Sequence, residues 1–263
     1  MNSKIEFSKY GRLIPSTTDY VFSEEDRRYF AIKSLSQPSQ ATFQKFKQVF
    51  GNNISISEDE FSTQIANLID KLQKSEELQQ LLNGPFTPYL IPKNMAAGTI
   101  EAALNTLLEL LGSSYVKEYP AYEFKNFAPL LQKNMIKIVE NSRLNLLLEN
   151  GQHSDHVGLY FPTVFAGYSI YSQRQLIKKF PAGFALSGPL EIACALIGSP
   201  GLLLRTDDTY PNGLAASGIE PTDKNQKNFF WYFESYGWNL NFNYRSMVGP
   251  PSEYFSGGLS FFA

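Results

Sequence analysis

The two histidines of the chain, His153 and His156, lie three residues apart with Asp155 between them. Imidazole nitrogens act as acid–base groups near neutral pH and as metal ligands, and a neighbouring carboxylate can orient them. A zinc site would need a third and usually a fourth ligand from elsewhere in the chain. The sequence therefore predicts no cofactor and leaves only a divalent metal open. The alternative interpretation is a polar turn in which Asp155 or Ser154 binds backbone N–H groups.

The single cysteine, Cys194, is the candidate thiol nucleophile. Such a nucleophile needs a lowered pKa, which a nearby histidine or a helix N-terminus can supply. Cys194 stands instead within the apolar run EIACALIG, which favours a buried side chain. Glu191 opens the same run and is a candidate acid or base. The candidate catalytic set, if the fold brings its members to one cleft, is His153, Asp155, His156 and Cys194.

Two further stretches are candidates for binding. The segment RTDDTYPNG has an arginine, paired aspartates and an Asn-Gly turn, a pattern that suits either polar-ligand binding or a solvated loop. The block 229–238 is dense in aromatic residues, which anchor protein interfaces but also fill cores. The candidate binding residues are Arg205, Asp207, Asp208, Trp231 and Trp238.

Composition excludes several classes of protein. Hydrophobic residues make up 43% of the chain and charged residues 18%, with a net charge of −2, which indicates a folded chain rather than a disordered one. Balanced charge excludes nucleic acid as a partner. The glycine-rich phosphate-binding loops and the Gly-x-Ser-x-Gly nucleophile motif are missing from the sequence. The apolar stretch 181–204 is interrupted by two prolines and Glu191, so we expect no transmembrane segment.

The N-terminal stretch lacks the apolar centre of a signal peptide, and one cysteine cannot form an intramolecular disulfide. Both features predict a cytoplasmic protein or one exported by a route that does not use a Sec signal.

Helical periodicity dominates the first 150 residues. Ser57 and Glu60 have the spacing of a capping box, and Gly51 and Gly112 are expected to end the helices before them. The last helix is apolar on most sides, which is typical of the centre of a bundle. Helices are expected over 23–35, 38–50, 57–72, 94–111 and 129–149.

The second half has a mixed pattern. We expect a short strand ended by Pro162, helices over 167–180 and 189–198, a long loop over 206–226, and a strand from Trp238 where apolar and polar residues alternate. The apolar ending FSGGLSFFA either docks on the domain or is an exposed sorting signal.

These patterns predict a mainly α protein with a smaller α+β C-terminal part. A helical bundle over 1–150 would pack on a short antiparallel sheet and loop region in an aromatic-rich part over 151–263, and the two would share one core. The predicted function is that of a soluble bacterial binding protein, with export as an effector open, that contacts a protein partner in a host or inside the cell. The sequence specifies no small-molecule ligand. The alternative is a hydrolase or transferase with a His/Cys/Asp cleft, or a metal-dependent enzyme with ligands from the His153–His156 turn.

Overall fold

The computed structural model describes residues 5–15, 32, 39–96, 98–128, 130–223, 229–246 and 255–262. Its α-helices are α1 (Ser39–Phe50), α2 (Glu58–Gln73), α3 (Lys93–Ala96), α4 (Ile100–Glu118), α5 (Leu144–His153), α6 (Ile170–Leu176) and α7 (Pro189–Gly198). Its short 3₁₀ helices are η1 (Gly51–Asn53), η2 (Gln79–Asn83), η3 (Ile177–Lys179) and η4 (Pro200–Leu203). Its strands are β1 (Thr87–Ile91), β2 (Phe124–Asn126), β3 (Ile136–Ile138), β4 (His156–Phe161), β5 (Phe184–Leu186), β6 (Gly213–Ala215), β7 (Ile219–Pro221), β8 (Phe229–Tyr236), β9 (Asn239–Ser246), β10 (Phe255–Gly257) and β11 (Leu259–Phe262).

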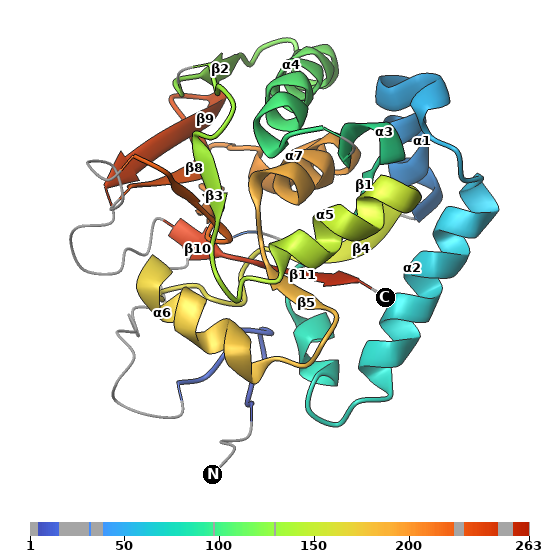
Figure 1. Ribbon diagram of the computed structural model, residues 1–263, viewed down its shortest axis with the longest axis vertical. Helices are drawn as coiled ribbons and strands as arrows, with labels where there is room; N and C mark the ends of the chain where they lie inside the picture. The colour runs from blue at the N-terminus through green and yellow to red at the C-terminus, as the bar shows by residue number, and fades with distance from the viewer. Residues whose placement is uncertain are drawn as a thin grey trace.

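The fold is mixed α/β, so the predicted mainly α class is wrong. Helix accounts for 42% of the described residues and strand for 25%, and the two kinds of element are interleaved along the chain (Figure 1). The described strands form a four-stranded sheet in the order β1-β4-β11-β5, a five-stranded sheet in the order β10-β6-β8-β9-β2, and the pair β3-β7. The five-stranded sheet includes two parallel pairs, β2 with β9 and β10 with β6, and so is not the short antiparallel sheet that we expected.

The predicted long helix over 129–149 is the largest single error. Within this range the structure has β3 and then, after a turn, the start of α5, whereas Pro129 lies outside the described residues. Asn134, Asn141 and Arg143 have left-handed backbones, with φ of 68°, 66° and 63°. A right-handed helix cannot continue through such residues, and asparagine adopts this conformation more readily than most side chains. The apolar periodicity of the segment therefore belongs to two separate elements.

The helix α4 does not end at Gly112, as we expected, but continues for six more residues to Glu118. It also begins at Ile100 rather than at residue 94, because the short α3 occupies the preceding residues. A Cβ atom at Gly112 would lie 2.6 Å from the ring of Phe124. This glycine therefore allows β2 to pack closely against the helix and does not terminate it.

The two N-terminal helices that the structure describes confirm their predictions. α1 ends where predicted, and Gly51 follows it with φ of 56°. The capping box of α2 is present: the Ser57 hydroxyl accepts the backbone N–H of Glu60 at 3.2 Å, and the Glu60 carboxylate accepts that of Ser57 at 2.7 Å. The helix predicted over 23–35 lies outside the described residues, except for Ile32.

In the second half, β4, the pair α6–η3, α7 and β9 confirm the predicted strands and helices. The segment predicted as a loop over 206–226 contains β6 and β7. The apolar ending of the chain forms β10 and β11, and β11 pairs antiparallel with both β4 and β5. The ending is therefore an interior strand of the four-stranded sheet and not an exposed tail.

The helix α7 is buried along its whole length and packs against β1, α4 and α1 (Figure 1). The main hydrophobic cluster around it draws side chains from both sides of residue 150, from Ile5 to Phe262. In the part of the chain that the structure describes, no helix has both the length and the apolar character needed to cross a bilayer.

Candidate functional site

The structure places the two histidines in different environments. His153 ends α5 and is exposed, whereas His156 begins β4 and is only 6% exposed. The buried ring packs against the rings of Tyr89 and Phe262. Across the described ranges, no three His, Cys, Asp or Glu side chains are grouped so that they could hold a metal ion. One imidazole of this turn therefore faces solvent and the other lies in the core.

The Asp155 carboxylate is buried and binds the backbone of two distant segments. Its Oδ2 accepts the N–H groups of Ser55 at 2.6 Å and Ile56 at 3.0 Å, and also the Ser55 hydroxyl at 2.8 Å. Its Oδ1 accepts the Lys93 N–H at the start of α3, at 3.0 Å. Hydrogen bonds to a charged acceptor are stronger than neutral ones. Asp155 therefore holds backbone N–H groups, but those of distant segments and not of its own turn as the polar-turn interpretation implied.

His156 lies in the core next to a tyrosine hydroxyl. Its Nε2 is 3.3 Å from the Oη of Tyr89. Burial lowers the pKa of His156 to about 4, so the ring is neutral at physiological pH. The Tyr89 ring lies directly over Gly158 on the paired strand, where a Cβ atom would come within 2.4 Å of it. The lack of a side chain at Gly158 therefore makes room for the tyrosine that contacts the histidine.

Glu191 is the one charged residue of α7, and it is completely buried. Its Oε1 accepts the Gly188 N–H at the helix start and the Ser260 hydroxyl of β11 at 3.2 Å, but its Oε2 has no hydrogen-bond partner. Burial raises the pKa of Glu191 to about 7, against the lowering effect of these hydrogen bonds. A group that is half protonated near neutral pH is suited to acid–base chemistry. However, the side chain has no exposed surface through which a substrate could reach it.

Cys194 lies one helical turn after Glu191 and is also fully buried. Burial, together with the nearby Glu191, raises the pKa of the thiol well above its usual range. A nucleophilic cysteine needs the opposite shift. Among the described residues, the hydrogen bond of the His156 ring is with the Tyr89 hydroxyl and not with Cys194. Of the candidate catalytic residues, Asp155, His156 and Cys194 are therefore buried, whereas His153 is exposed at the end of α5.

The predicted binding residues near 205 form a tight turn. Thr206 and Thr209 exchange backbone hydrogen bonds at 3.0 and 3.2 Å, which leaves Asp207 and Asp208 exposed at the tip. The guanidinium of Arg205 does not pair with either aspartate, and lies over two aromatic rings instead. Its Cζ is 4.4 Å from the ring centre of Tyr210 and 4.9 Å from that of Trp238.

The two tryptophans of the candidate binding set have opposite placements. Trp231 is 5% exposed and faces the main core, whereas Trp238 is 41% exposed at the turn between β8 and β9. Gly237 and Trp238 form that two-residue turn with φ of 59° and 67°. Type I′ turns of this kind usually carry Asn-Gly, because both positions need positive φ. Trp238 is therefore held in a conformation that bulky residues rarely adopt.

Sequence reasoning missed the tyrosines that complete this surface. The Tyr122 hydroxyl donates to the Arg205 carbonyl at 3.0 Å, and its ring centre is 6.4 Å from that of Trp238. Tyr122 in turn packs on Tyr115 and Tyr119. The spacing of these three tyrosines, four residues and then three, is the helical signal by which the cluster could have been found.

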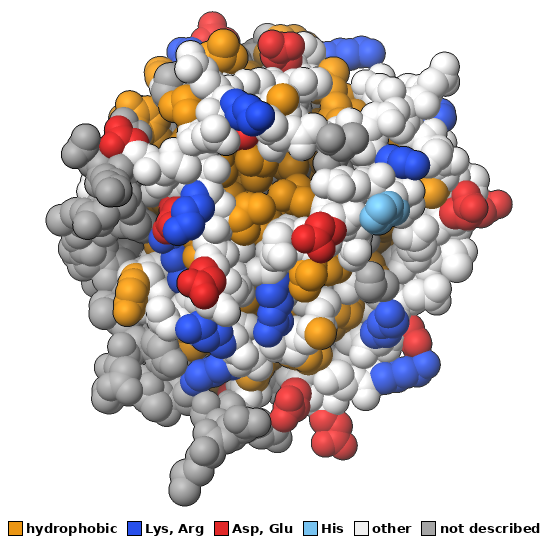
Figure 2. Space-filling view, viewed as in Figure 1, with side chains coloured by type: hydrophobic (Ala, Val, Ile, Leu, Met, Phe, Trp, Pro, Cys, Tyr) orange, Lys and Arg blue, Asp and Glu red, His pale blue; other side chains and the backbone are white. Residues whose placement is uncertain are grey.

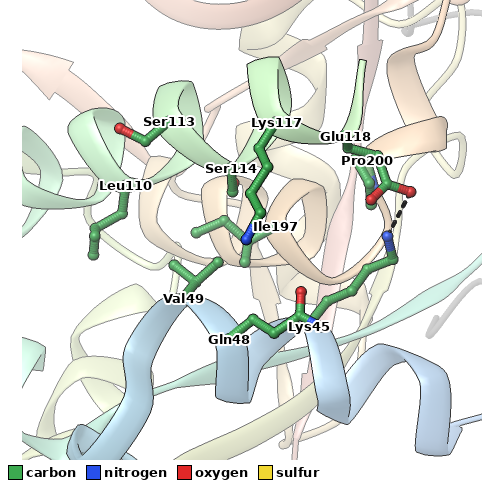
Figure 3. A pocket seen from close by; sticks show the side chains of 10 residues that line it. All are labelled: Lys45, Gln48, Val49, Leu110, Ser113, Ser114, Lys117, Glu118, Ile197 and Pro200. Atoms are coloured by element: carbon green, nitrogen blue, oxygen red, sulfur yellow. Dashed lines mark ion pairs between the residues drawn. The ribbon is translucent and has the colours of Figure 1, made fainter. Parts of the chain in front are cut away.

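A separate pocket lies between α1 and α4, with a cavity volume of about 310 Å³. Its base is the end of α7 and the start of η4 (Figure 3). One side carries an ion pair of 2.7 Å between Lys45 and Glu118. None of the candidate residues from the sequence lines it. The lining residues are Lys45, Gln48, Val49, Leu110, Ser113, Ser114, Lys117, Glu118, Ile197 and Pro200.

The chain matches no protein-family model, no curated protein and no solved structure.

We expect Asp155→Asn to lower the free energy of unfolding by about 2 to 4 kcal/mol. An amide nitrogen would replace one of the oxygens that accept backbone N–H groups, and would leave buried donors unpaired. The matched control is His153→Asn on the exposed neighbour, which should change the free energy by less than about 0.5 kcal/mol. Urea unfolding measures both variants. Equal effects of the two substitutions would contradict the anchoring role of Asp155.

The substitution Glu191→Gln should change the pH dependence of the free energy of unfolding relative to that of the wild type. The folded chain keeps the Glu191 proton until about pH 7, whereas the unfolded chain releases it near 4.5. The wild type therefore loses stability through this group as pH rises from 4.5 to 7, and the variant does not. We expect the stability of the variant relative to wild type to increase by about 3 kcal/mol over that range. Urea unfolding of both proteins at several pH values tests this, since the opposite contribution of His156 cancels in the difference. A difference that does not vary with pH would rule out a buried, protonated Glu191.

Proposed function

We propose that this protein is a binding protein that contacts a protein partner through an arginine–aromatic surface. This surface consists of Tyr122, Arg205, Tyr210 and Trp238, which come from the segment between α4 and β2, the loop after η4 and the β8–β9 turn. Tyrosine, tryptophan and arginine are the residue types that most often dominate binding energy at protein interfaces.

The observation that carries the proposal is the backbone of Trp238, with φ of 67°. A left-handed conformation costs a side chain of this kind roughly 1 to 2 kcal/mol, and glycine or asparagine would avoid most of that cost. Strained residues of this sort are concentrated at functional sites. Here the strain holds a large ring, 41% exposed, beside the guanidinium of Arg205.

The chemistry of the surface suits a partner that presents carboxylates or backbone carbonyls next to apolar groups. Within the described part of the chain, the guanidinium of Arg205 has no carboxylate partner, so its N–H donors can bind one. Ring contacts also hold this side chain in place before binding, which reduces the entropy that binding costs.

Two further features support binding over catalysis. The groups with catalytic potential, Glu191, Cys194 and His156, are all buried. On the face shown in Figure 2, positive and negative side chains are interspersed without a continuous region of one sign, which suits a protein partner better than a nucleic acid. A bacterial source and export as an effector are part of this proposal and rest on the sequence alone.

We expect Trp238→Ala and Arg205→Ala each to weaken binding of the partner by about 30-fold or more, a typical effect at the centre of an interface. The partner is first captured by crosslinking in a lysate of the source cells, then purified so that its Kd can be measured. Tyr171→Ala is the matched control, because Tyr171 is 72% exposed on α6 and lies outside this surface. Its Kd should stay within about twofold of wild type.

A further variant separates binding from folding. Trp238→Gly removes the ring and the strained side chain together, so it should be more stable than Trp238→Ala by about 1 kcal/mol while it binds just as weakly. The proposal is wrong if the partner binds both Trp238 variants and Arg205→Ala as tightly as wild type, or if no captured protein depends on Trp238.

A further inference from the structure

The pocket between α1 and α4 has the size and the mixed lining of a small-molecule site. Its volume of about 310 Å³ lies at the lower end of the range for ligand pockets. It shares no residue with the arginine–aromatic surface. A function at this pocket would therefore be additional to the proposed protein contact.

The base of the pocket is apolar. Val49 from α1, Leu110 from α4, Ile197 at the end of α7 and Pro200 at the start of η4 supply its apolar lining (Figure 3). An apolar group of a ligand that binds here would be transferred from water to an apolar surface, and this transfer lowers the free energy. The base therefore favours the hydrocarbon or ring portion of a ligand.

The charged groups of the pocket are the ion pair of Lys45 with Glu118 and the amine of Lys117. Lys45 is bound to Glu118, so these two charges largely compensate each other. Lys117 reaches from α4 toward the middle of the pocket in Figure 3, and it lines the same pocket as Ile197. The Lys117 side chain is exposed, and the ion pair at the pocket is formed by Lys45 and Glu118 rather than by Lys117. A positive charge above an apolar base favours a negatively charged group.

We propose that this pocket binds a small molecule with an apolar body and one anionic head, such as a carboxylate or a phosphate. The head contacts the Lys117 amine, and the body lies on Val49 and Ile197. The amide of Gln48 supplies a further donor at the rim. The hydroxyls of Ser113 and Ser114 donate to helix carbonyls at 2.9 and 3.0 Å, and so do not compete for the head.

The test uses three probes that share an eight-carbon chain and differ in the charge of the head: octanoate, octanol and octyltrimethylammonium. Isothermal titration of the full chain measures each Kd. Octanoate should bind about tenfold or more tightly than octanol, because a charge-assisted hydrogen bond adds to the same apolar contact. Octyltrimethylammonium should bind more weakly than octanol.

Variants test whether the probes bind in this pocket and whether Lys117 causes the preference for an anionic head. Lys117→Met keeps the length of the side chain and should abolish the preference for octanoate over octanol. Lys178→Met is the matched control, because Lys178 is an exposed lysine on η3 outside the pocket, and it should keep that preference. Val49→Trp fills the cavity and should weaken octanoate and octanol alike.

Three results would overturn the proposal: no binding of octanoate, a Lys117→Met variant that binds octanoate as wild type does, or binding of octyltrimethylammonium at least as tight as that of octanoate. The last result would mean that the carbonyl ends of α1 and α7, with their partial negative charge, decide the preference in place of Lys117.

Discussion

The burial of α7 is the constraint on which the rest of the fold depends. All ten of its residues are removed from solvent, so each polar group on this helix needs a partner inside the protein. Its one carboxylate, Glu191, accepts the Gly188 N–H and the Ser260 hydroxyl, and a retained proton reduces the remaining cost of burial. Ser260 can serve in this way only because β11 is inserted between β4 and β5. The C-terminal strand and the central helix therefore depend on each other.

The same constraint determines where function can lie. Side chains that would act as acid, base or nucleophile at a surface, such as Glu191 and Cys194, are used here to complete the core, and Asp155 is used to anchor the starts of two helices. In the proposed function, exposed aromatic and cationic groups are the means of recognition. Trp238 belongs to a strained aromatic turn, whereas Lys117 lines the pocket between α1 and α4.

Local signals in the sequence predicted local structure well. They failed where the structure depends on contacts between segments that are distant in the chain. The capping box at Ser57 and the strand after Trp238 follow from neighbouring residues alone, and both are present. The helix expected over 129–149 failed because apolar periodicity does not reveal left-handed residues such as Asn141. The surroundings of the candidate catalytic residues could not be predicted for a related reason: the hydrogen-bond partner of His156 is 67 residues away in the chain. Nothing local distinguishes a core tryptophan from an exposed one.

The reactivity of Cys194 in the native protein tests most directly whether the chemically capable groups are sealed in the core. A thiol-specific reagent such as 5,5′-dithiobis(2-nitrobenzoic acid) is added to the folded chain, and the rate is followed as urea is increased. The account predicts no labelling on the timescale of a free thiol in native buffer, and labelling that rises in parallel with unfolding, because the thiol is fully buried. Rapid stoichiometric labelling without denaturant would show an accessible thiol beside Glu191 and would contradict the account.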